Sequence, residues 1–241
     1  MEQNFNFLRK LFHFSGVIIS FFYYINFIDI FNINIFYDNN RSFISLTLLL
    51  LIFFLTIVEF LRFRNEAIQN LFIKFTGKLL KKDELYRVNG SLPFLAGLFF
   101  ITAFLPKNIA ILSAVFLVSA DPAAAYFGSR YGKTRFYNGK SIEGTIAAFF
   151  SAFFLGIAFL IINYFYSSDS ILNVNTESVI IVCIGAASSA IVEFFSSRDW
   201  LDDNLLLPVF SGIIMTIAYS ILFNIEIKLI LLSPDKIFLP L

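Results

Sequence analysis

Charged residues are scarce in this chain of 241 residues, at 15% of the total. Soluble domains carry about a quarter charged residues, so a chain this poor in charge has too little polar surface to cover a water-soluble globule. Hydrophobic residues make up 58% of the sequence, and the mean hydropathy is +0.79. This excess of apolar residues predicts a protein embedded in a lipid bilayer.

Cysteine and net charge are also nearly absent. The single cysteine, Cys183, cannot form an internal disulfide, so the sequence implies no particular redox compartment. The net charge of +1 gives no electrostatic reason to expect nucleic acid as a partner. The placement of the charges is therefore more informative than their sum.

Long apolar runs recur along the chain at lengths that suit transmembrane helices. A helix needs about 20 mainly apolar residues to cross a bilayer. The sequence contains no internal repeat and no linker, so residues 1–241 are predicted to form one integral-membrane domain with an all-α, polytopic fold. The seven predicted spans are Leu8–Ile28, Phe43–Leu61, Leu92–Leu105, Ile109–Phe127, Thr145–Tyr166, Ser178–Phe195 and Leu205–Phe223.

The third predicted span, Leu92–Leu105, is shorter than a normal span and has Pro93 at its start. The basic residues test its existence, because cytoplasmic loops are enriched in lysine and arginine. With seven spans, one side carries fourteen basic residues and the other carries four, which together account for all 18. Without the third span, the cluster at Arg130–Lys140 would lie opposite the cluster at Arg62–Arg87. The sequence therefore predicts about seven spans, with a cytoplasmic N-terminus and the C-terminus outside.

The first group of polar residues surrounds Asp121, near the cytoplasmic end of the fourth predicted span. An ionisable side chain within a span is costly, so it is by default a candidate for function. Gly128 and Gly132 follow at helical spacing and allow a neighbouring backbone or a ligand to come close. The alternative is that Asp121 caps a helix at the membrane interface, with small residues beside it for packing.

The loop after the fourth span combines glycines with basic residues. Glycines let backbone N–H groups approach oxyanions, and basic side chains neutralise them, so this loop is a candidate phosphate site. It is not a P-loop, because neither Gly-Lys pair has the required earlier glycine and no strand precedes them. An ordinary basic loop would explain the lysines but not the glycines or the glutamate. The candidates are Gly128, Arg130, Gly132, Lys133, Gly139, Lys140, Ser141, Glu143 and Gly144.

Acidic residues gather on the same side of the membrane, around the sixth and seventh spans. Glu193 shares a helical face with Gly185 and Ser189, which gives a polar stripe into the bundle. Carboxylate and amide oxygens suit a hard cation such as Mg²⁺. The alternative is a solvated turn that carries charges, which we prefer for Asp199. The predicted metal ligands are Asp121, Asp202 and Asp203, with Asn204 in support.

Two further groups are predicted to have mainly structural roles. Arg9, His13 and Gly16 share one face of the first predicted helix, because their spacings are four and three residues. A lone histidine near a helix end is more often a hydrogen-bonded interface residue than a catalyst, so Arg9 and His13 are assigned to lipid contact or structural support. Glu59 and Arg62, three residues apart on the second span, are predicted to form a salt bridge.

Taken in order, these motifs resemble those of the CTP-dependent lipid kinases, a family that includes dolichol kinase, phytol kinase and CTP-dependent diacylglycerol kinase. The resemblance runs from residue 9 to residue 208, and the ordered set is more specific than any single block. The blocks are Arg9-Lys10-x-x-His13-x-x-Gly16, Asp121-x-x-Ala124-x-x-x-Gly128-x-x-x-Gly132-Lys133, Gly139-Lys140-Ser141-x-Glu143-Gly144-Thr145, Glu193 and Asp202-Asp203-Asn204-Leu205-x-x-Pro208.

The resemblance implies transfer of the γ-phosphoryl group of CTP to a membrane lipid alcohol, with Mg²⁺ as cofactor. The predicted location is the cell (inner) membrane, and the distribution of basic residues predicts that the site faces the cytoplasm. The acceptors left open are a polyprenol, a phytol-like alcohol and diacylglycerol, and CTP rather than ATP rests on the resemblance alone. Lys133 and Lys140 would hold phosphates, with Arg130 nearby, and Glu143 and Glu193 would position ligands or a basic side chain. The predicted catalytic residues are Asp121, Lys133, Lys140, Glu143 and Glu193.

Phosphatidate cytidylyltransferases are the nearest alternative, because they share the middle block of motifs and also use CTP. Their C-terminal signature contains Pro-Gly-His-Gly-Gly, which this sequence lacks. Its last third offers Asp202-Asp203-Asn204 instead, so we favour a kinase. A transporter would require ionisable residues through the membrane depth, whereas the middles of these spans are nearly free of charge. A non-catalytic scaffold would leave the clustered acids and glycines unexplained.

Overall fold

The computed structural model describes residues 15–31, 35–36, 38–77, 85–136, 139–166, 171–196 and 202–231. Within these ranges the regular secondary structure is helical, and Arg135 and Ser141 form an isolated antiparallel bridge. The predicted all-α fold is therefore confirmed. Arg9, His13 and Asp199 lie outside the described residues.

Five of the described helices, α3, α6, α7, α8 and α9, are long and apolar enough to cross a membrane. The helices α2 and α5 are also apolar but shorter, and they lie where the first and third spans were predicted. By length alone the structure thus supports five of the seven predicted spans. The element bounds are α2 (Ser15–Tyr24), η1 (Phe27–Phe31), α3 (Asn39–Arg62), α4 (Glu66–Thr76), α5 (Ser91–Phe104), α6 (Lys107–Tyr131), α7 (Ile142–Tyr166), α8 (Thr176–Phe195), α9 (Asp203–Phe223) and α10 (Ile227–Ile230).

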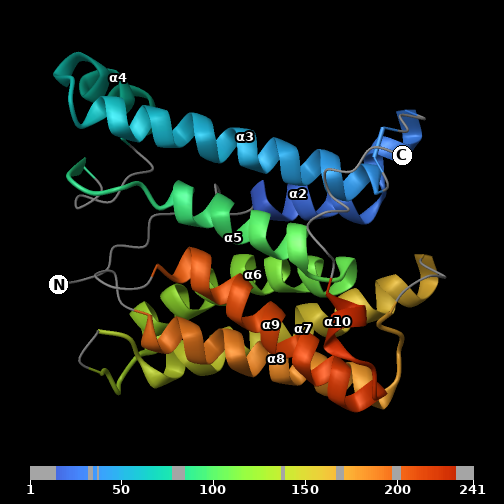
Figure 1. Cartoon of the computed structure of the whole chain (residues 1–241). Coiled ribbons are helices and arrows are strands. Elements are labelled where there is room, and N and C mark those ends of the chain that lie inside the picture. Colours follow the sequence, from blue (N-terminus) through green and yellow to red (C-terminus); the bar gives the residue numbers. More distant parts are fainter. Residues whose placement is uncertain are drawn as a thin grey trace.

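The long helices and α2 and α5 run side by side in alternating directions (Figure 1). As a result, the end of α6, the end of α8 and the start of α9 lie at one end of the bundle, which we call the site end. The helices α3 and α5 are antiparallel, because Arg41 at the start of α3 donates to the carbonyl of Ala103 near the end of α5. Thus α5 runs from the site end to the opposite end. This is the direction expected of a third span that places the two basic clusters on the same side.

Helix α6 forms the centre of the bundle and packs against α2, α5, α7, α8 and α9. Two thirds (67%) of its most apolar stretch is buried inside the protein, compared with 22% for α3. Large side chains such as Leu112, Phe116 and Leu117 are fully enclosed along α6. The central helix therefore carries Asp121 on a face that neighbouring helices cover, and α3 lies at the lipid-facing edge.

Side-chain caps fix where several helices begin. Asp38 accepts a hydrogen bond from the backbone of Arg41 at the start of α3, and Asn175 accepts one from the backbone of Ser178 at the start of α8. Asp202 caps α9 in the same way. Such caps satisfy N–H groups that have no partner within the helix. The cap at Asp202 makes the next residue the first of α9.

Helix α4 was not predicted from the sequence and lies beside the end of α3 (Figure 1). Arg62 holds it there, because this guanidinium bonds to Gln69 of α4 at 3.2 Å and to the carbonyl of Arg87 at 2.6 Å. The predicted salt bridge is confirmed, with Arg62 Nη2 2.8 Å from Glu59 Oε2. This buried arginine thus joins α3, α4 and the segment that leads into α5.

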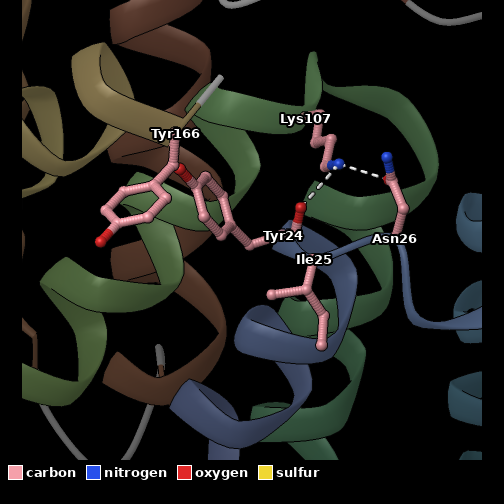
Figure 2. Close-up of a pocket in the computed structure, with 5 residues that line it drawn as sticks. All are labelled: Tyr24, Ile25, Asn26, Lys107 and Tyr166. Atoms are coloured by element: carbon pink, nitrogen blue, oxygen red, sulfur yellow. Dashed lines mark hydrogen bonds between the residues drawn. The ribbon is translucent and has the colours of Figure 1, made fainter.

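A cavity of about 320 Å³ lies at the opposite end of the bundle (Figure 2). Lys107 Nζ donates to the carbonyl of Tyr24 at 3.0 Å and to Asn26 Oδ1 at 2.5 Å, which ties the end of α2 to the start of α6. None of the predicted site residues lines this cavity. Its lining residues are Tyr24, Ile25, Asn26, Lys107 and Tyr166.

Candidate active site

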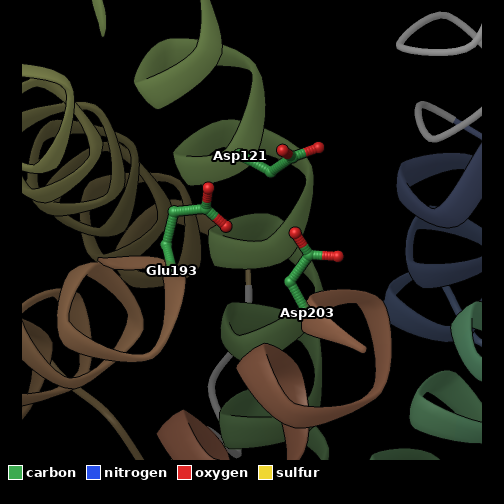
Figure 3. Close-up of side chains that lie close together, drawn as sticks. All are labelled: Asp121, Glu193 and Asp203. Atoms are coloured by element: carbon green, nitrogen blue, oxygen red, sulfur yellow. The ribbon is translucent and has the colours of Figure 1, made fainter. Parts of the chain in front are cut away.

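Three carboxylates from three different helices converge at the site end (Figure 3). Asp121 comes from α6, Glu193 from α8 and Asp203 from the first position of α9, and one oxygen of each lies within 4.8 Å of the other two. Asp121 and Glu193 are buried and Asp203 is half-buried. Like charges this close repel one another strongly away from bulk water. The arrangement therefore favours the binding of a cation among them.

The local sequence explains how two of these residues reach the site. Asp121 lies on the enclosed face of α6 and is followed at once by Pro122. Because proline has no N–H, the carbonyl of Val118 loses its usual helical hydrogen bond at the level of the carboxylates. Asp203 is placed by the cap at Asp202, since the cap decides that α9 begins directly beside the end of α8.

The donor set fits a hard divalent cation. Mg²⁺ is bound in proteins through one or two carboxylates together with water and substrate phosphates. The Oε2 atom of Glu193 is buried and has no hydrogen-bond partner within the described part of the chain. A buried acceptor without a partner is costly, and a cation bound at this point would satisfy it. Asp121, Glu193 and Asp203 are thus the residues that could hold Mg²⁺.

The ammonium group of Lys140 lies against one side of this carboxylate cluster. Its Nζ is 3.0 Å from Glu193 Oε1 and 2.7 Å from Ser196 Oγ, and it also donates to the backbone carbonyl of Glu193. An ammonium has three N–H donors, and these contacts engage all of them. Lys140 therefore joins the α6–α7 loop to the C-terminal end of α8. The sequence had predicted Lys140 only as a phosphate ligand.

The α6–α7 loop folds into a tight hairpin. The backbone N–H of Phe136 donates to the carbonyl of Lys140 at 2.9 Å, and Gly139 turns the chain with a φ of +78°, a region that favours glycine. Arg135 fastens the hairpin, because it donates to the carbonyls of Gly139 and Gly128, both at 3.1 Å. From the sequence, Arg135 was only one member of the basic cluster between Arg130 and Lys140. The contacts of Arg135 with these carbonyls, and the contact of Ser196 with Lys140, could be found only in the folded chain.

Gly128, Gly132 and Gly144 pack around the side chain of Ser141. A Cβ on Gly144 would lie 2.8 Å from the carbonyl oxygen of Ala124, and one on Gly132 would lie 2.3 Å from that of Gly128. The hydroxyl of Ser141 accepts a hydrogen bond from the backbone of Gly144 at 3.1 Å and so caps the first turn of α7. These small residues let α6 and α7 approach closely beside the carboxylates. Their predicted contact with phosphate stays a prediction.

Arg130 and Lys133 are exposed on the α6–α7 side of the site end. Arg130 donates to the hydroxyl of Tyr126 at 3.0 Å. Among the described residues, neither cation forms an ion pair with the three carboxylates, so both are accessible to a ligand that arrives from solvent. Glu143 is half-buried, and its Oε1 accepts a hydrogen bond from the backbone of Thr134 at 3.4 Å. Glu143 therefore braces the loop from the start of α7.

Asp202 is not a member of the three-carboxylate cluster, although the sequence predicted it as a metal ligand. Its Oδ1 accepts hydrogen bonds from the backbone N–H of Asn204 at 2.9 Å and from Nδ2 of Asn204 at 2.8 Å. Asn204 is buried, and its side chain is bonded to the carboxylate that caps α9. The third carboxylate of the cluster is Glu193, whereas Asp202 was predicted to lie beside Asp121 and Asp203.

Comparison with known proteins places these motifs in a wider context. The chain is 32% identical over 206 residues to the uncharacterized protein RP860 of Rickettsia prowazekii, a match that covers 83% of this chain and 88% of RP860. It is 29% identical over 181 residues to CTP-dependent diacylglycerol kinase 1 of Eremothecium gossypii, covering 68% of this chain and 56% of that kinase. The kinase of the same name from Saccharomyces cerevisiae is 28% identical over 176 residues, covering 67% and 59%. No family model and no solved structure matches the chain.

The chain belongs to the CTP-dependent lipid kinase family. The resemblance inferred from the ordered motifs is thereby confirmed. The chain spans a little over half the length of the first two fungal kinases that it matches. In this member of the lipid kinase family, the carboxylate cluster, the glycine-rich loop and Lys140 lie together at one end of a helical membrane bundle.

Proposed function

We propose that this protein transfers the γ-phosphoryl group of CTP to the hydroxyl of a membrane lipid alcohol and releases CDP. The observation that carries the proposal is the convergence of Asp121, Glu193 and Asp203 at one end of the bundle in a member of the CTP-dependent lipid kinase family. Diacylglycerol is the first acceptor to test, because the fungal relatives are named diacylglycerol kinases. Polyprenols and phytol-like alcohols are the next candidates.

The proposed chemistry depends on positioning and charge stabilisation, which dominate catalysis of phosphoryl transfer. Asp121, Glu193 and Asp203 are proposed to hold Mg²⁺, which when bound neutralises charge on the phosphates. Arg130 and Lys133, exposed on the loop side, meet the incoming triphosphate. These side chains bring the nucleotide to the cluster and fix its orientation.

Lys140 has a double role in the proposal. In the structure its three donors hold the loop to α8 through Glu193 and Ser196. The same ammonium lies beside the carboxylates, where a phosphate of the nucleotide would approach. Lys140 thus keeps the loop in place and adds positive charge at the edge of the cluster.

The site end is proposed to face the cytoplasm, and the protein to lie in the cell (inner) membrane. Cytoplasmic segments of membrane proteins are enriched in lysine and arginine. Most of the basic residues in the described ranges lie at the site end, whereas Arg41, Lys107 and Lys228 lie at the opposite end. The described basic residues at the site end are Arg62, Arg64, Lys74, Arg87, Arg130, Lys133, Arg135 and Lys140.

The lipid is proposed to approach from the side, at the depth of the headgroups. Glu193 lies two residues before the end of α8, and Asp203 is the first residue of α9. Both therefore lie where apolar spans meet the aqueous boundary. A lipid hydroxyl occupies this depth while its acyl chains remain in the bilayer, so the acceptor can reach the cluster without leaving the membrane.

Product analysis with CTP labelled separately at the α and γ phosphates tests the proposal. Membranes that contain the protein would be supplied with Mg²⁺ and with diacylglycerol, a polyprenol or phytol. We expect γ label, and no α label, to enter the lipid. Phosphatidate would be offered as a further acceptor, because a phosphatidate cytidylyltransferase acts on that lipid. Label from the α position in the lipid would identify such an enzyme.

A matched variant ties the activity to the site. Asp121→Asn keeps the size of the side chain but removes one charge from the carboxylate cluster, so we expect transfer to be lost while the protein still inserts into the membrane. Absence of transfer from both CTP and ATP to every lipid offered would overturn the kinase assignment. Retained turnover in the Asp121→Asn variant would overturn the assignment of the site.

A further inference from the structure

Helix α4 exposes two different strips side by side. Residues spaced by four lie on one face of a helix, and on α4 one exposed strip is polar (Glu66, Asn70 and Lys74). The neighbouring exposed strip is apolar and consists of Ala67, Leu71 and Phe75. Phe75 is 76% exposed and Leu71 is 55% exposed. Large apolar side chains this exposed on a helix next to a membrane span indicate contact with lipid.

The third face of α4 is fixed against the protein. Arg62 lies over the ring of Phe72 at 4.7 Å, and Gln69 Nε2 donates to the carbonyl of Leu85 at 3.0 Å. These contacts set the rotation of α4 about its own axis. The apolar strip therefore points away from the protein because the packing holds it there.

The helix that precedes α4 along the chain also has an exposed apolar side. Helix α3 exposes Phe53, Ile57 and Phe60 along its outer side, and α4 begins four residues after α3 ends. The apolar strip of α4 therefore comes directly after a candidate membrane span whose exposed side chains are apolar.

Basic residues lie at the same level. Arg64 places its guanidinium 4.2 Å from the ring of Phe60, in the last turn of α3, and Lys74 borders the apolar strip of α4. Both side chains are exposed. Basic groups beside an apolar strip at the membrane surface are attracted to the phosphates of anionic lipids.

We propose that α4 lies in the headgroup layer at the site end and binds the anionic lipid surface of the membrane that the protein spans. Leu71 and Phe75 enter the boundary of the acyl chains, Arg64 and Lys74 contact lipid phosphates, and Asn70 faces water. This surface is separate from the carboxylate cluster, so the proposal stands independently of the phosphoryl-transfer reaction.

Spin labels on single cysteines test the orientation of α4. The full chain, carrying Cys183→Ser, would be labelled at Leu71→Cys, at Phe75→Cys and, as the matched control, at Asn70→Cys. It would then be reconstituted in vesicles of phosphatidylcholine and phosphatidylglycerol. Oxygen concentrates in the bilayer and a neutral nickel chelate stays in water, so their collision rates with the label report depth. We expect oxygen to dominate at residues 71 and 75, and the nickel chelate to dominate at residue 70.

Two outcomes would overturn the proposed orientation. If all three labels meet the nickel chelate equally, α4 lies in water. If the labels at residues 71 and 75 are shielded from both reagents, protein covers the strip, and a second copy of the chain becomes the occupant.

A lipid-selectivity measurement tests the basic residues. The ratio of motionally restricted spin-labelled phosphatidylglycerol to phosphatidylcholine around the protein would be compared in the unmodified chain and in the double variant Arg64→Gln, Lys74→Gln. We expect this ratio to fall in the double variant and at high salt, because salt screens exposed charges. The matched control is Lys228→Gln, which removes an exposed lysine at the opposite end. This variant should keep the part of the lipid ratio that is due to α4. An unchanged ratio in the double variant would refute the binding of anionic headgroups.

Discussion

Lys140 and Glu193 form an ion pair, with Nζ and Oε1 3.0 Å apart, although 53 residues separate them in the chain. The pair joins the α6–α7 loop to the end of α8. Because Glu193 also belongs to the carboxylate cluster, the same contact places the loop beside the candidate metal site. The geometry of the carboxylate cluster and the position of the loop are therefore linked through Glu193.

We expect Lys140→Met to lower both activity and stability. Glu193 would keep its buried charge without a partner, which is destabilising. Loss of one cation that stabilises developing charge lowers turnover by about 100-fold or more. The measurements are γ-label transfer to lipid and thermal unfolding in detergent.

The double variant Lys140→Met, Glu193→Gln separates the two effects. Removing the unpaired charge should restore part of the lost stability, whereas activity should stay low because the cluster has lost a carboxylate. If the double variant were no more stable than Lys140→Met alone, the ion pair would not be the source of the stability loss.

Asp202 and Asp203 are adjacent in the chain but have different predicted effects. Asp203→Asn removes a charge from the carboxylate cluster, so we expect it to abolish transfer or to raise the Mg²⁺ concentration needed for half-maximal activity at least tenfold, which is about 1.4 kcal/mol. Asp202→Asn keeps a side chain that caps helices well, so activity should change little. A titration of activity against Mg²⁺ for both variants makes the comparison. Equal loss in the two would restore Asp202 as a ligand.

Removal of divalent cations should stop the reaction, and added Mg²⁺ should restore it. A ligand that binds the folded state alone also stabilises it by mass action. We therefore expect Mg²⁺ to raise the thermal unfolding temperature of the unmodified protein and to have a smaller effect on Asp121→Asn. The same stabilisation in both proteins would place the cation elsewhere, whatever the activity shows.

The packing of α6 on α7 gives a prediction that concerns stability alone. A methyl group on Gly144 would lie 2.8 Å from the carbonyl oxygen of Ala124, so Gly144→Ala should separate the two helices and cost about 1–3 kcal/mol. Gly139→Asn is the control, because no atom lies within 4 Å of the added Cβ and asparagine tolerates a positive φ. Thermal unfolding of the two variants tests the ranking. A Gly144→Ala protein as stable as the control would show that the helices can part at little cost.

Hydrophobic patterning was sufficient to place most of the helices. The second predicted span, Phe43–Leu61, lies within α3, and the sixth, Ser178–Phe195, lies within α8. An apolar run of this length has few alternatives in a bilayer, because every backbone polar group must be bonded internally. Helix α4 was missed because only part of its surface is apolar and its position depends on Arg62, a residue of the preceding helix.

The candidate site was predicted only in part. Asp121 and Asp203 were predicted as metal ligands, since a carboxylate near the end of an apolar span is rare and costly, and the structure brings both into the carboxylate cluster. The third member of the cluster was assigned to Asp202 rather than to Glu193. Periodicity could not decide between them, because this choice depends on where α9 begins and on how α8 lies beside it.

The sequence by itself determined that this protein is an all-helical membrane protein of the CTP-dependent lipid kinase family, and it indicated which polar residues would be functional. Those conclusions follow from composition and from the order of motifs along the chain, which need no knowledge of distances. Only the tertiary structure decided that Asp121, Glu193 and Asp203 meet, that Lys140 is bonded to α8, and that the loop glycines serve the packing of α6 on α7. These contacts join residues far apart in sequence, and the packing of the helices brings them together.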